Sequence, residues 1–463
     1  MCQRRNRIEA IANLTFPGGL HPPDNKQITE DCVISMGPVP KQVAVMLSQH
    51  IGAPCEPTVA KKDKVAAGQI IGKSEAFVSA PVHSPVDGTV KDIALRSHPV
   101  LGRSLAVIID VDQENAPLTP VNALFNETFD ETQYTSDQIL DAVHTAGIVG
   151  MGGAGFPTKV KIVPNEKMPK TDLIINACEC EPFITCDYRV MIEWTYQLIA
   201  GIKLANRVTN CPNVYIGIED NKPRAIQAVI DAVKKCKGTE NWKVCSVKTK
   251  YPQGGEKQLI KSILNKDVPV GGIPPMIGVA VMNVATCAVL AEAVVMNRPL
   301  IYRLVTVTGK AINKPGNYYV PVGTTVEDMI AHCGGTKKSV AKVIMGGPMM
   351  GFAIADLSTP LTKTSGSLIF LTKDDITRAK YDRRETPCIR CGRCLTVCPA
   401  ILNPTKIAHA VKANRLDLAE QYHMASCIEC GCCSYICPAN IEITGFIKTG
   451  KILAARAKKR MPQ

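Results

Sequence analysis

Residues 150–161, "GMGGAGFPTKVK", place glycines in a G-x-G-x-x-G pattern at Gly150, Gly152 and Gly155. In a dinucleotide fingerprint a strand runs directly into these glycines, a helix follows, and an acid lies about 20 residues further on. The preceding residues 137–147, "DQILDAVHTAG", instead carry apolar side chains at helical spacing and end in a glycine, which leaves too few residues for a strand. The pattern therefore indicates no dinucleotide fold. It indicates a basic, glycine-rich loop that can bring backbone N–H groups to a phosphate.

The composition is that of a soluble globular chain with several domains. Its 463 residues predict about three domains of ~100–200 residues each. The net charge of +13 comes with only 5% aromatic residues and no interleaving of basic and aromatic side chains, which argues against a nucleic-acid target. The N-terminus has no apolar run typical of a secretory signal. The apolar run at 276–296 is interrupted by Asn283, Thr286 and Glu292, so we expect a buried helix there and not a membrane span.

Changes in composition divide the chain into seven segments. Residues 58–110 alternate short apolar runs with turns, as in an all-β unit, and residues 138–300 alternate helices with β-rich runs such as "DLIINA". A helix that begins at Thr325-x-x-Asp328 and ends at two glycines predicts an α+β unit. We expect a multidomain α/β plus α+β chain with these segments: a β unit at 1–110, an acidic linker at 111–137, an α/β domain at 138–300, an α+β unit at 301–372, a polar linker at 373–387, a cysteine-rich unit at 388–445 and a basic tail at 446–463.

Eight of the 20 cysteines form two copies of C-x₂-C-x₂-C-x₃-C-P, "CIRCGRCLTVCP" and "CIECGCCSYICP". Three thiolates at this spacing wrap one corner of an iron–sulfur cube, and the fourth, before proline, belongs to the other cube. Two structural zinc ions are the alternative, although zinc sites prefer C-x₂-C pairs separated by longer spacers. The pattern predicts two [4Fe–4S] clusters: cluster 1 held by Cys388, Cys391, Cys394 and Cys437, and cluster 2 held by Cys427, Cys430, Cys433 and Cys398.

A flavin is the cofactor expected to feed these clusters. Iron–sulfur clusters accept one electron at a time, a nicotinamide gives two as a hydride, and a flavin converts between the two. Lys161 suits a phosphate, and Asn176 at the end of a strand can hydrogen-bond an isoalloxazine edge or a ribityl chain. Glu179 and Glu181 on the next turn can receive ribose hydroxyls. A plain turn and two solvated loop acids are the alternative interpretation.

Four motifs, "GGAGFPTKVK", "INACECEP", "YPQGGE" and "MNVATCAVLAEAV", resemble the flavin and NADH motifs of the NADH-binding flavoprotein subunit of respiratory complex I. With "FPGGLHPPDNK" at 16–26 before them and a double-cluster ferredoxin unit after them, they resemble more closely the C-subunit family of the Rnf (Rsx) ion-translocating ferredoxin:NAD⁺ oxidoreductases, over essentially the whole chain. The resemblance implies a lipoyl-like barrel-sandwich domain with no lysine to acylate near Phe77. An FMN/NADH-binding domain, a β-grasp unit of the SLBB type and the ferredoxin domain would follow.

The resemblance also implies roles for individual residues. No side chain is expected to be catalytic, because FMN carries the chemistry. Cys178, Met151 and Gly255 depart from the complex I pattern at positions near the flavin. The residues implied to contact FMN are Gly150, Gly152, Gly153, Lys161, Asn176, Asn283 and Thr286, and those implied to face NADH are Phe156, Glu179, Glu181 and Glu256.

The same resemblance implies an electron-transfer subunit. It would exchange a hydride between NAD(H) and FMN and pass single electrons through two [4Fe–4S] clusters to other Rnf subunits, with ferredoxin as an indirect redox partner. We expect a peripheral position on the cytoplasmic face of the cell membrane, with the basic tail assisting contact with the membrane surface. A soluble NADH-dependent cobalamin reductase of a microcompartment and a non-catalytic ferredoxin-like adaptor are the alternatives.

Overall fold

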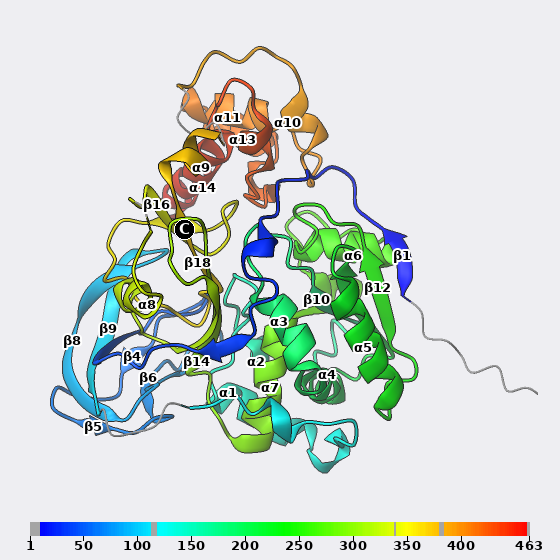
Figure 1. The fold of residues 1–463 in the computed structure, drawn as a ribbon. Helices are drawn as coiled ribbons and strands as arrows, with labels where there is room; N and C mark the ends of the chain where they lie inside the picture. The colour runs from blue at the N-terminus through cyan, green and yellow to red at the C-terminus, as the bar shows by residue number, and fades with distance from the viewer. Residues whose placement is uncertain (1–9, 113–117, 338, 379–383, 461–463) are drawn as a thin grey trace, which may run out of the picture.

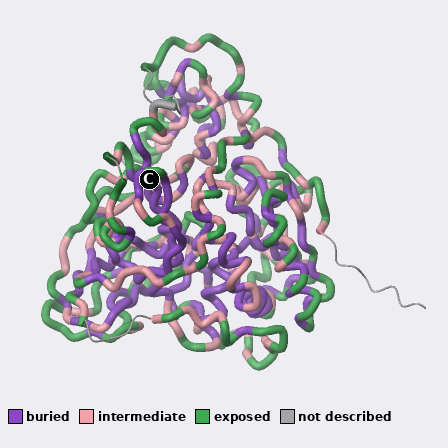
Figure 2. The backbone as a smooth tube through the Cα atoms, in the orientation of Figure 1, coloured by how far each residue is buried: buried purple, intermediate pink, exposed green. Residues whose placement is uncertain are grey.

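The computed structural model describes residues 10–112, 118–337, 339–378 and 384–460, and they form four packed units (Figure 1). A β unit lies at the lower left of Figure 1, a larger α/β unit at the lower right, and a helical unit at the top. A second mixed unit fills the centre, and the purple core in Figure 2 runs continuously through the lower units.

The β unit is a sandwich of two small sheets. One sheet has the order β3-β9-β8-β5 and the other the order β4-β6-β7. Apolar side chains from both sheets, such as Val45, Ile71 and Val107, are buried between them. Phe77 lies at an exposed turn of this unit. The strands are β3 (Gln42–Met46), β4 (Glu56–Pro57), β5 (Lys64–Val65), β6 (Ile70–Lys73), β7 (Val82–His83), β8 (Gly88–His98) and β9 (Gly102–Val111).

Residues 10–40 do not join this sandwich, although the sequence placed them with it. Strand β1 (Ile11–Leu14) pairs in parallel with β12 of the α/β unit, and β2 (Ile34–Met36) pairs in parallel with β15 of the central unit. The short helix η1 (Lys26–Ile28) lies between them. This segment therefore runs across the molecule and supplies an edge strand to each of two sheets (Figure 1).

The α/β unit is built on a parallel sheet with the order β1-β12-β11-β10-β13. Because its strands are parallel, their carboxyl ends meet at one edge, where ligands of such sheets bind. The strands are β10 (Asp172–Ala177), β11 (Asn213–Glu219), β12 (Lys243–Val247) and β13 (Val279–Asn283). The helices are α1 (Ser136–Thr145), α2 (Thr158–Ile162), α3 (Cys186–Glu193), α4 (Thr195–Thr209), α5 (Pro223–Lys235), α6 (Glu256–Leu264) and α7 (Val284–Met296), and short turns η2 (Asn122–Leu124) and η3 (Glu131–Gln133) precede them.

Of two expectations for this unit, the absence of a strand before the glycine loop is confirmed and the single helix at 276–296 is wrong. Helix α1 ends before Gly147 and no strand lies between it and the glycine loop, as predicted. The apolar run at 276–296 is not one helix, because it begins with η4 (Pro274–Ile277), continues as β13 and becomes helical only at α7. The change occurs at Asn283, whose backbone is extended and whose side chain accepts a hydrogen bond from the Thr286 N–H, so that it caps α7. Helix α7 is buried against α4, where Gly201 leaves room for the Cys287 carbonyl.

The central unit is a mixed sheet with the order β17-β16-β18-β14-β15-β2. The predicted helix is α8 (Val326–His332), and Thr325 and Asp328 form its capping box. The remaining strands are β14 (Tyr302–Thr308), β15 (Gly316–Pro321), β16 (Lys342–Met345), β17 (Phe352–Ile354) and β18 (Ser367–Leu371).

The cysteine-rich unit is helical. The supposed linker at 373–387 begins with a helix, α9 (Lys373–Arg378). The described part of the supposed tail, residues 446–460, belongs to α14 (Ile443–Arg460). Helix α14 is not a free tail, because Ile447 is buried and Phe446 and Ala454 pack on the core of this unit. No helix of the described residues is long and apolar enough to cross a membrane. The other helices are α10 (Arg393–Thr396), α11 (Pro404–Lys412), α12 (Leu416–Gln421), η5 (Met424–Ser426) and α13 (Cys432–Ile436).

Candidate functional site

The glycine loop between α1 and α2 presents backbone donors to solvent. It is closed by hydrogen bonds from the Gly150 N–H to the Phe156 carbonyl (2.8 Å) and from the Gly155 N–H to the Gly150 carbonyl (3.2 Å). The Met151 N–H donates to Thr286 Oγ1 at the start of α7 (2.9 Å). The next three N–H groups, of residues 152–154, donate to no acceptor in the described chain, and Gly153 has a φ of 121° with open space around it. Three exposed donors in a row fit an anionic group such as a phosphate.

The two predicted asparagines lie side by side at the carboxyl edge of the sheet. Asn176 and Asn283 are paired residues of β10 and β13. The Asn176 amide donates to the Gly254 carbonyl (2.8 Å) and accepts from the Cys178 N–H (3.1 Å). The Asn283 amide donates to Asp187 Oδ2 (2.6 Å). Both side chains therefore shape the edge of the site through hydrogen bonds within the protein.

Lys161 and Glu256 meet although the sequence assigned them to different ligands. Lys161 Nζ lies 3.0 Å from Glu256 Oε1 and donates to the Val281 carbonyl at 2.9 Å. Phe156 follows the same loop and is half-buried. Lys159, two residues before Lys161, points elsewhere and lies 3.9 Å from Asp141. Of the two lysines, only Lys161 is aimed at the edge of the sheet.

Glu179 is enclosed by residues that the sequence did not single out. Its Oε1 accepts from the Asp187 N–H (2.6 Å), while Oε2 has no hydrogen-bond partner in the described chain and lies 3.9 Å from Lys26 Nζ. Burial raises the pKa of Glu179 above its ordinary value, and the Lys26 charge opposes that shift. Lys26 also donates to the carbonyls of Glu181 and Ile184, which holds the turn after β10 in place.

Glu181 is held by the central unit. Its carboxylate accepts from the Met349 N–H (3.1 Å) and the Met350 N–H (3.0 Å), and the Tyr251 hydroxyl lies 3.4 Å away. Burial raises the pKa of Glu181 to about 7, against the effect of the two N–H groups. A side chain at Gly347 would collide with this carboxylate, so the loop at 346–351 can approach only because that residue is glycine.

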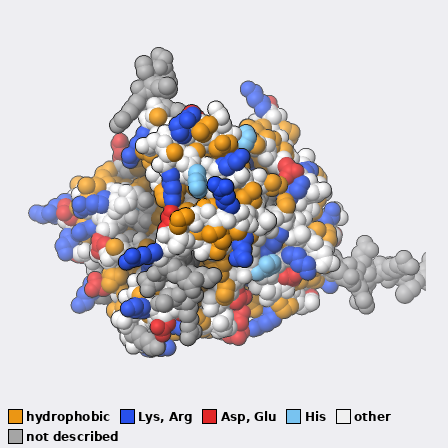
Figure 3. All heavy atoms as spheres, turned by 90° about the horizontal axis from the view of Figure 1, so that it is seen from above, with side chains coloured by type: hydrophobic (Ala, Val, Ile, Leu, Met, Phe, Trp, Pro, Cys, Tyr) orange, Lys and Arg blue, Asp and Glu red, His pale blue; other side chains and the backbone are white. Residues whose placement is uncertain are grey.

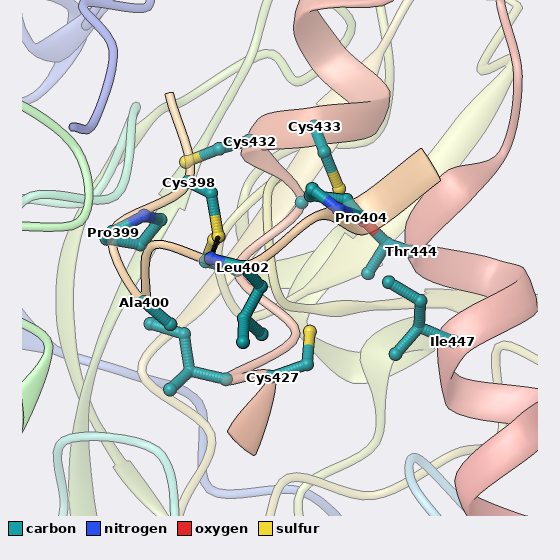
Figure 4. A pocket seen from close by; sticks show the side chains of 13 residues that line it. Cys398, Pro399, Ala400, Leu402, Pro404, Cys427, Cys432, Cys433, Thr444 and Ile447 are labelled. Atoms are coloured by element: carbon teal, nitrogen blue, oxygen red, sulfur yellow. Dashed lines mark hydrogen bonds between the residues drawn. The ribbon is translucent and has the colours of Figure 1, made fainter. Parts of the chain in front are cut away.

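The cysteines predicted to hold cluster 2 line one cavity. Cys427, Cys430 and Cys433 of the second motif share its wall with Cys398 of the first (Figure 4). Cys398 Sγ accepts from the Leu402 N–H, and Cys427 Sγ accepts from the Glu429 N–H. No three of these four sulfur atoms lie within 4.8 Å of one another.

The two cysteine motifs repeat each other 39 residues apart in backbone as well as in sequence. Gly392 and Gly431 both have positive φ, and Cys394 Sγ and Cys433 Sγ each contact a threonine hydroxyl eleven residues later. Of the residues predicted for cluster 1, Cys388, Cys394 and Cys437 pack on the core of the helical unit and Cys391 is exposed.

The second cysteine motif lies directly against the α/β unit. The Tyr251 hydroxyl donates to the Cys430 carbonyl (2.8 Å), and Leu20, Tyr251, Cys430 and Cys432 share one buried apolar cluster. The Gly19 N–H donates to the Val397 carbonyl (2.9 Å) of the first motif, and Val397 packs on the same cluster. Tyr251 thus contacts both Glu181 and the second motif.

Comparison with known proteins gives four matches in the order of the units. They are the RnfC barrel sandwich hybrid domain at residues 14–114, the Nuo51 FMN-binding domain at 143–292, the SLBB domain at 304–353 and a 4Fe-4S dicluster domain at 380–438. The chain is 42% identical to the C subunit of the proton-translocating ferredoxin:NAD(+) oxidoreductase complex of Clostridium ljungdahlii, over 85% of this chain and 84% of that one. The chain belongs to the C-subunit family of ion-translocating ferredoxin:NAD⁺ oxidoreductase complexes.

Another family member is the C subunit of the Na(+)-translocating complex of Acetobacterium woodii, with 40% identity over 88% of this chain and 89% of that one. Among solved structures, an NAD+-reducing [NiFe]-hydrogenase in the H2-reduced state matches with a TM-score of 0.51 and 18% identity, over 74% of this chain and 70% of that one. This likeness concerns the fold alone. The family matches confirm the predicted family, the fold class and the presence of an FMN-binding and a dicluster domain.

Proposed function

We propose that this chain is the NADH-linked electron-transfer subunit of an ion-translocating ferredoxin:NAD⁺ oxidoreductase complex. The observation that carries the proposal is Tyr251, which joins the acid at the expected nicotinamide site, Glu181, to the cysteine motif of cluster 2. The relatives named above are subunits of complexes with this activity. Neither relative is a cobalamin reductase or an adaptor, so the proposal keeps neither alternative.

FMN, when bound, would accept a hydride and release electrons one at a time. The loop N–H groups at 152–154 and Lys161 would hold its phosphate end, since charge-assisted contacts of this kind are roughly twice as strong as neutral ones. Asn176, Asn283 and Thr286 would form the floor at the carboxyl edge of the sheet, together with Gly150. Phe156, Glu179, Glu181 and Glu256 would line the approach of NADH.

The ligand assignment for the clusters remains as predicted, with Cys398 and Cys437 exchanged between the motifs. Cluster 2 would be the first to receive electrons, because its motif is the one packed against Tyr251 and Leu20. Cluster 1 would follow, and the exposed Cys391 would place it at the outer surface.

An anaerobic titration with NADH tests this order of events. In the reconstituted chain, NADH should reduce both clusters, as read by electron paramagnetic resonance. Lys161→Ala should lower FMN occupancy and abolish reduction by NADH, while dithionite still reduces the clusters directly. Lys159→Ala is the matched control, because Lys159 faces Asp141. Reduction of the clusters by NADH in a flavin-free Lys161→Ala sample would contradict the proposal.

The chain would be a peripheral subunit on the cytoplasmic face of the cell membrane. Partner subunits would hold it, and basic residues of α14 such as the exposed Arg456 would assist. In cells that make the whole complex it should pellet with membranes, and high salt or a chaotrope without detergent should release it. Recovery in the soluble fraction of such cells would refute the membrane position.

A further inference from the structure

The two cysteine motifs present the same surface in two different situations. In the second motif this surface consists of Ile428, Glu429, Cys430 and Cys432. Cys430 and Cys432 are buried, Ile428 packs with Tyr251 and Leu20, and the motif thereby meets the α/β unit. Within the chain, the second motif thus uses this surface to dock on the α/β unit.

The equivalent surface of the first motif is open. Ile389, the counterpart of Ile428, is 66% exposed. Leu395 and Ile401, which take the places of Ser434 and Asn440, are 43% and 77% exposed and add apolar area to the first motif alone. Cys391, the counterpart of the buried Cys430, is exposed as well. Figure 2 shows this outer loop of the helical unit largely in the colour of exposed residues. An exposed apolar patch beside a redox ligand is typical of an interaction site.

The charge of the two surfaces differs. Arg390 occupies the place of Glu429, and Arg393 the place of Cys432. Glu429 is paired with Lys451 at 2.8 Å, whereas neither Arg390 nor Arg393 forms an ion pair with another residue that the structure describes. Figure 3 shows the face that carries this unit, with hydrophobic patches bordered by Lys and Arg.

We propose that Ile389, Arg390, Cys391, Arg393, Leu395 and Ile401 form the face through which cluster 1 exchanges electrons with a partner protein. The partner would present carboxylates around a flat apolar centre. The arginines would orient it and speed association, and the apolar residues would exclude water at the contact. The inference rests on the proposed function, because it assigns the outer end of the same electron path.

The test uses the assembled complex carrying Arg390→Glu together with Arg393→Glu. Lys234→Glu with Lys235→Glu, at the exposed end of α5, is the control with the same change in charge. NADH-driven electron transfer to ferredoxin should fall at least tenfold in the arginine variant, and its dependence on salt should flatten. The lysine control should keep the rate and the salt dependence of the unaltered complex.

Two measurements keep the outcomes separate. Iron content and NADH-driven reduction of the clusters in the isolated arginine variant should equal those of the unaltered chain. If NADH does not reduce the clusters of the isolated unaltered chain, the proposed function is wrong, whatever the docking assay shows. Unchanged transfer in the assembled variant would overturn the docking face. The docking face would also be overturned if the isolated chain bound phosphatidylglycerol vesicles and the two substitutions abolished that binding, since the face would then contact lipid.

Discussion

Thr286→Val tests how the glycine loop is held. In the structure Thr286 Oγ1 accepts the Met151 N–H at 2.9 Å, and both residues are buried. Valine has nearly the same shape but no acceptor, so in the free protein the loop must shift to let this buried N–H reach water. Binding FMN would bury it again without a partner, which costs about 1–3 kcal/mol. We therefore expect the Kd for FMN to rise about tenfold, since each 1.4 kcal/mol corresponds to a factor of ten.

The assay is quenching of FMN fluorescence on titration with flavin-free protein. Thr286→Ser keeps the hydroxyl and should bind FMN within about a factor of three of the unaltered chain, well below the tenfold loss that 1.4 kcal/mol produces. Thermal unfolding of the flavin-free forms separates a loss of affinity from general instability. If Thr286→Val binds FMN as tightly as the serine variant, the Met151 hydrogen bond does not organise the loop and the reasoning is wrong.

Three further predictions follow from the same contacts. Because the folded pKa of Glu181 is raised to about 7, stability should fall as pH rises from about 4.5 to 7. Glu181→Gln should remove up to about 3 kcal/mol of this dependence in thermal unfolding, and an unchanged pH dependence would contradict the raised pKa. Burial lowers the pKa of Lys363 to about 7, so burying its charge costs stability below pH 7, and this cost fades toward pH 10. Lys363→Met takes the donor from the Pro81 and Gly147 carbonyls, so it should lower the free energy of unfolding in urea by about 2–5 kcal/mol at pH 9. The loss should be smaller at pH 6, where the variant also removes the cost of the buried charge. Cys398→Ser should lower iron from about eight to about four atoms per chain by damaging the cluster of Cys427, Cys430 and Cys433; damage to the cluster of the first motif would show that the ligands are not exchanged.

The parts of the site that could be predicted are those in which chemistry fixes the local spacing. Two copies of a four-cysteine motif indicate two clusters, and the short connection from α1 to the glycine loop excludes a first strand. The pairing of Asn176 with Asn283 was not predicted, because Asn283 was expected within a helix over 276–296 and instead ends strand β13.

The missed residues act through contacts between distant segments. Lys26 and Tyr251 stood inside motifs that the sequence had marked, "FPGGLHPPDNK" and "YPQGGE", but nothing in their spacing showed that one reaches Glu179 and the other Cys430. Asp187 lies in the first turn of α3 and carries no local signal for its hydrogen bond to Asn283. The loop at 346–351 belongs to another unit, so its hydrogen bonds to Glu181 depend on how the two domains pack.

The N-terminal segment has a consequence for how the chain folds during synthesis. Strand β1 needs β12, more than two hundred residues later, and β2 needs β15, almost three hundred residues later. The hydrogen bond from the Gly19 N–H needs Val397, which is made later still. The segment at 10–36 is therefore made well before its partners and is among the last to find its place, and until then its two strands stay unpaired and open to other chains. A chaperone that covers residues 10–36 during translation would protect this protein at its most aggregation-prone stage.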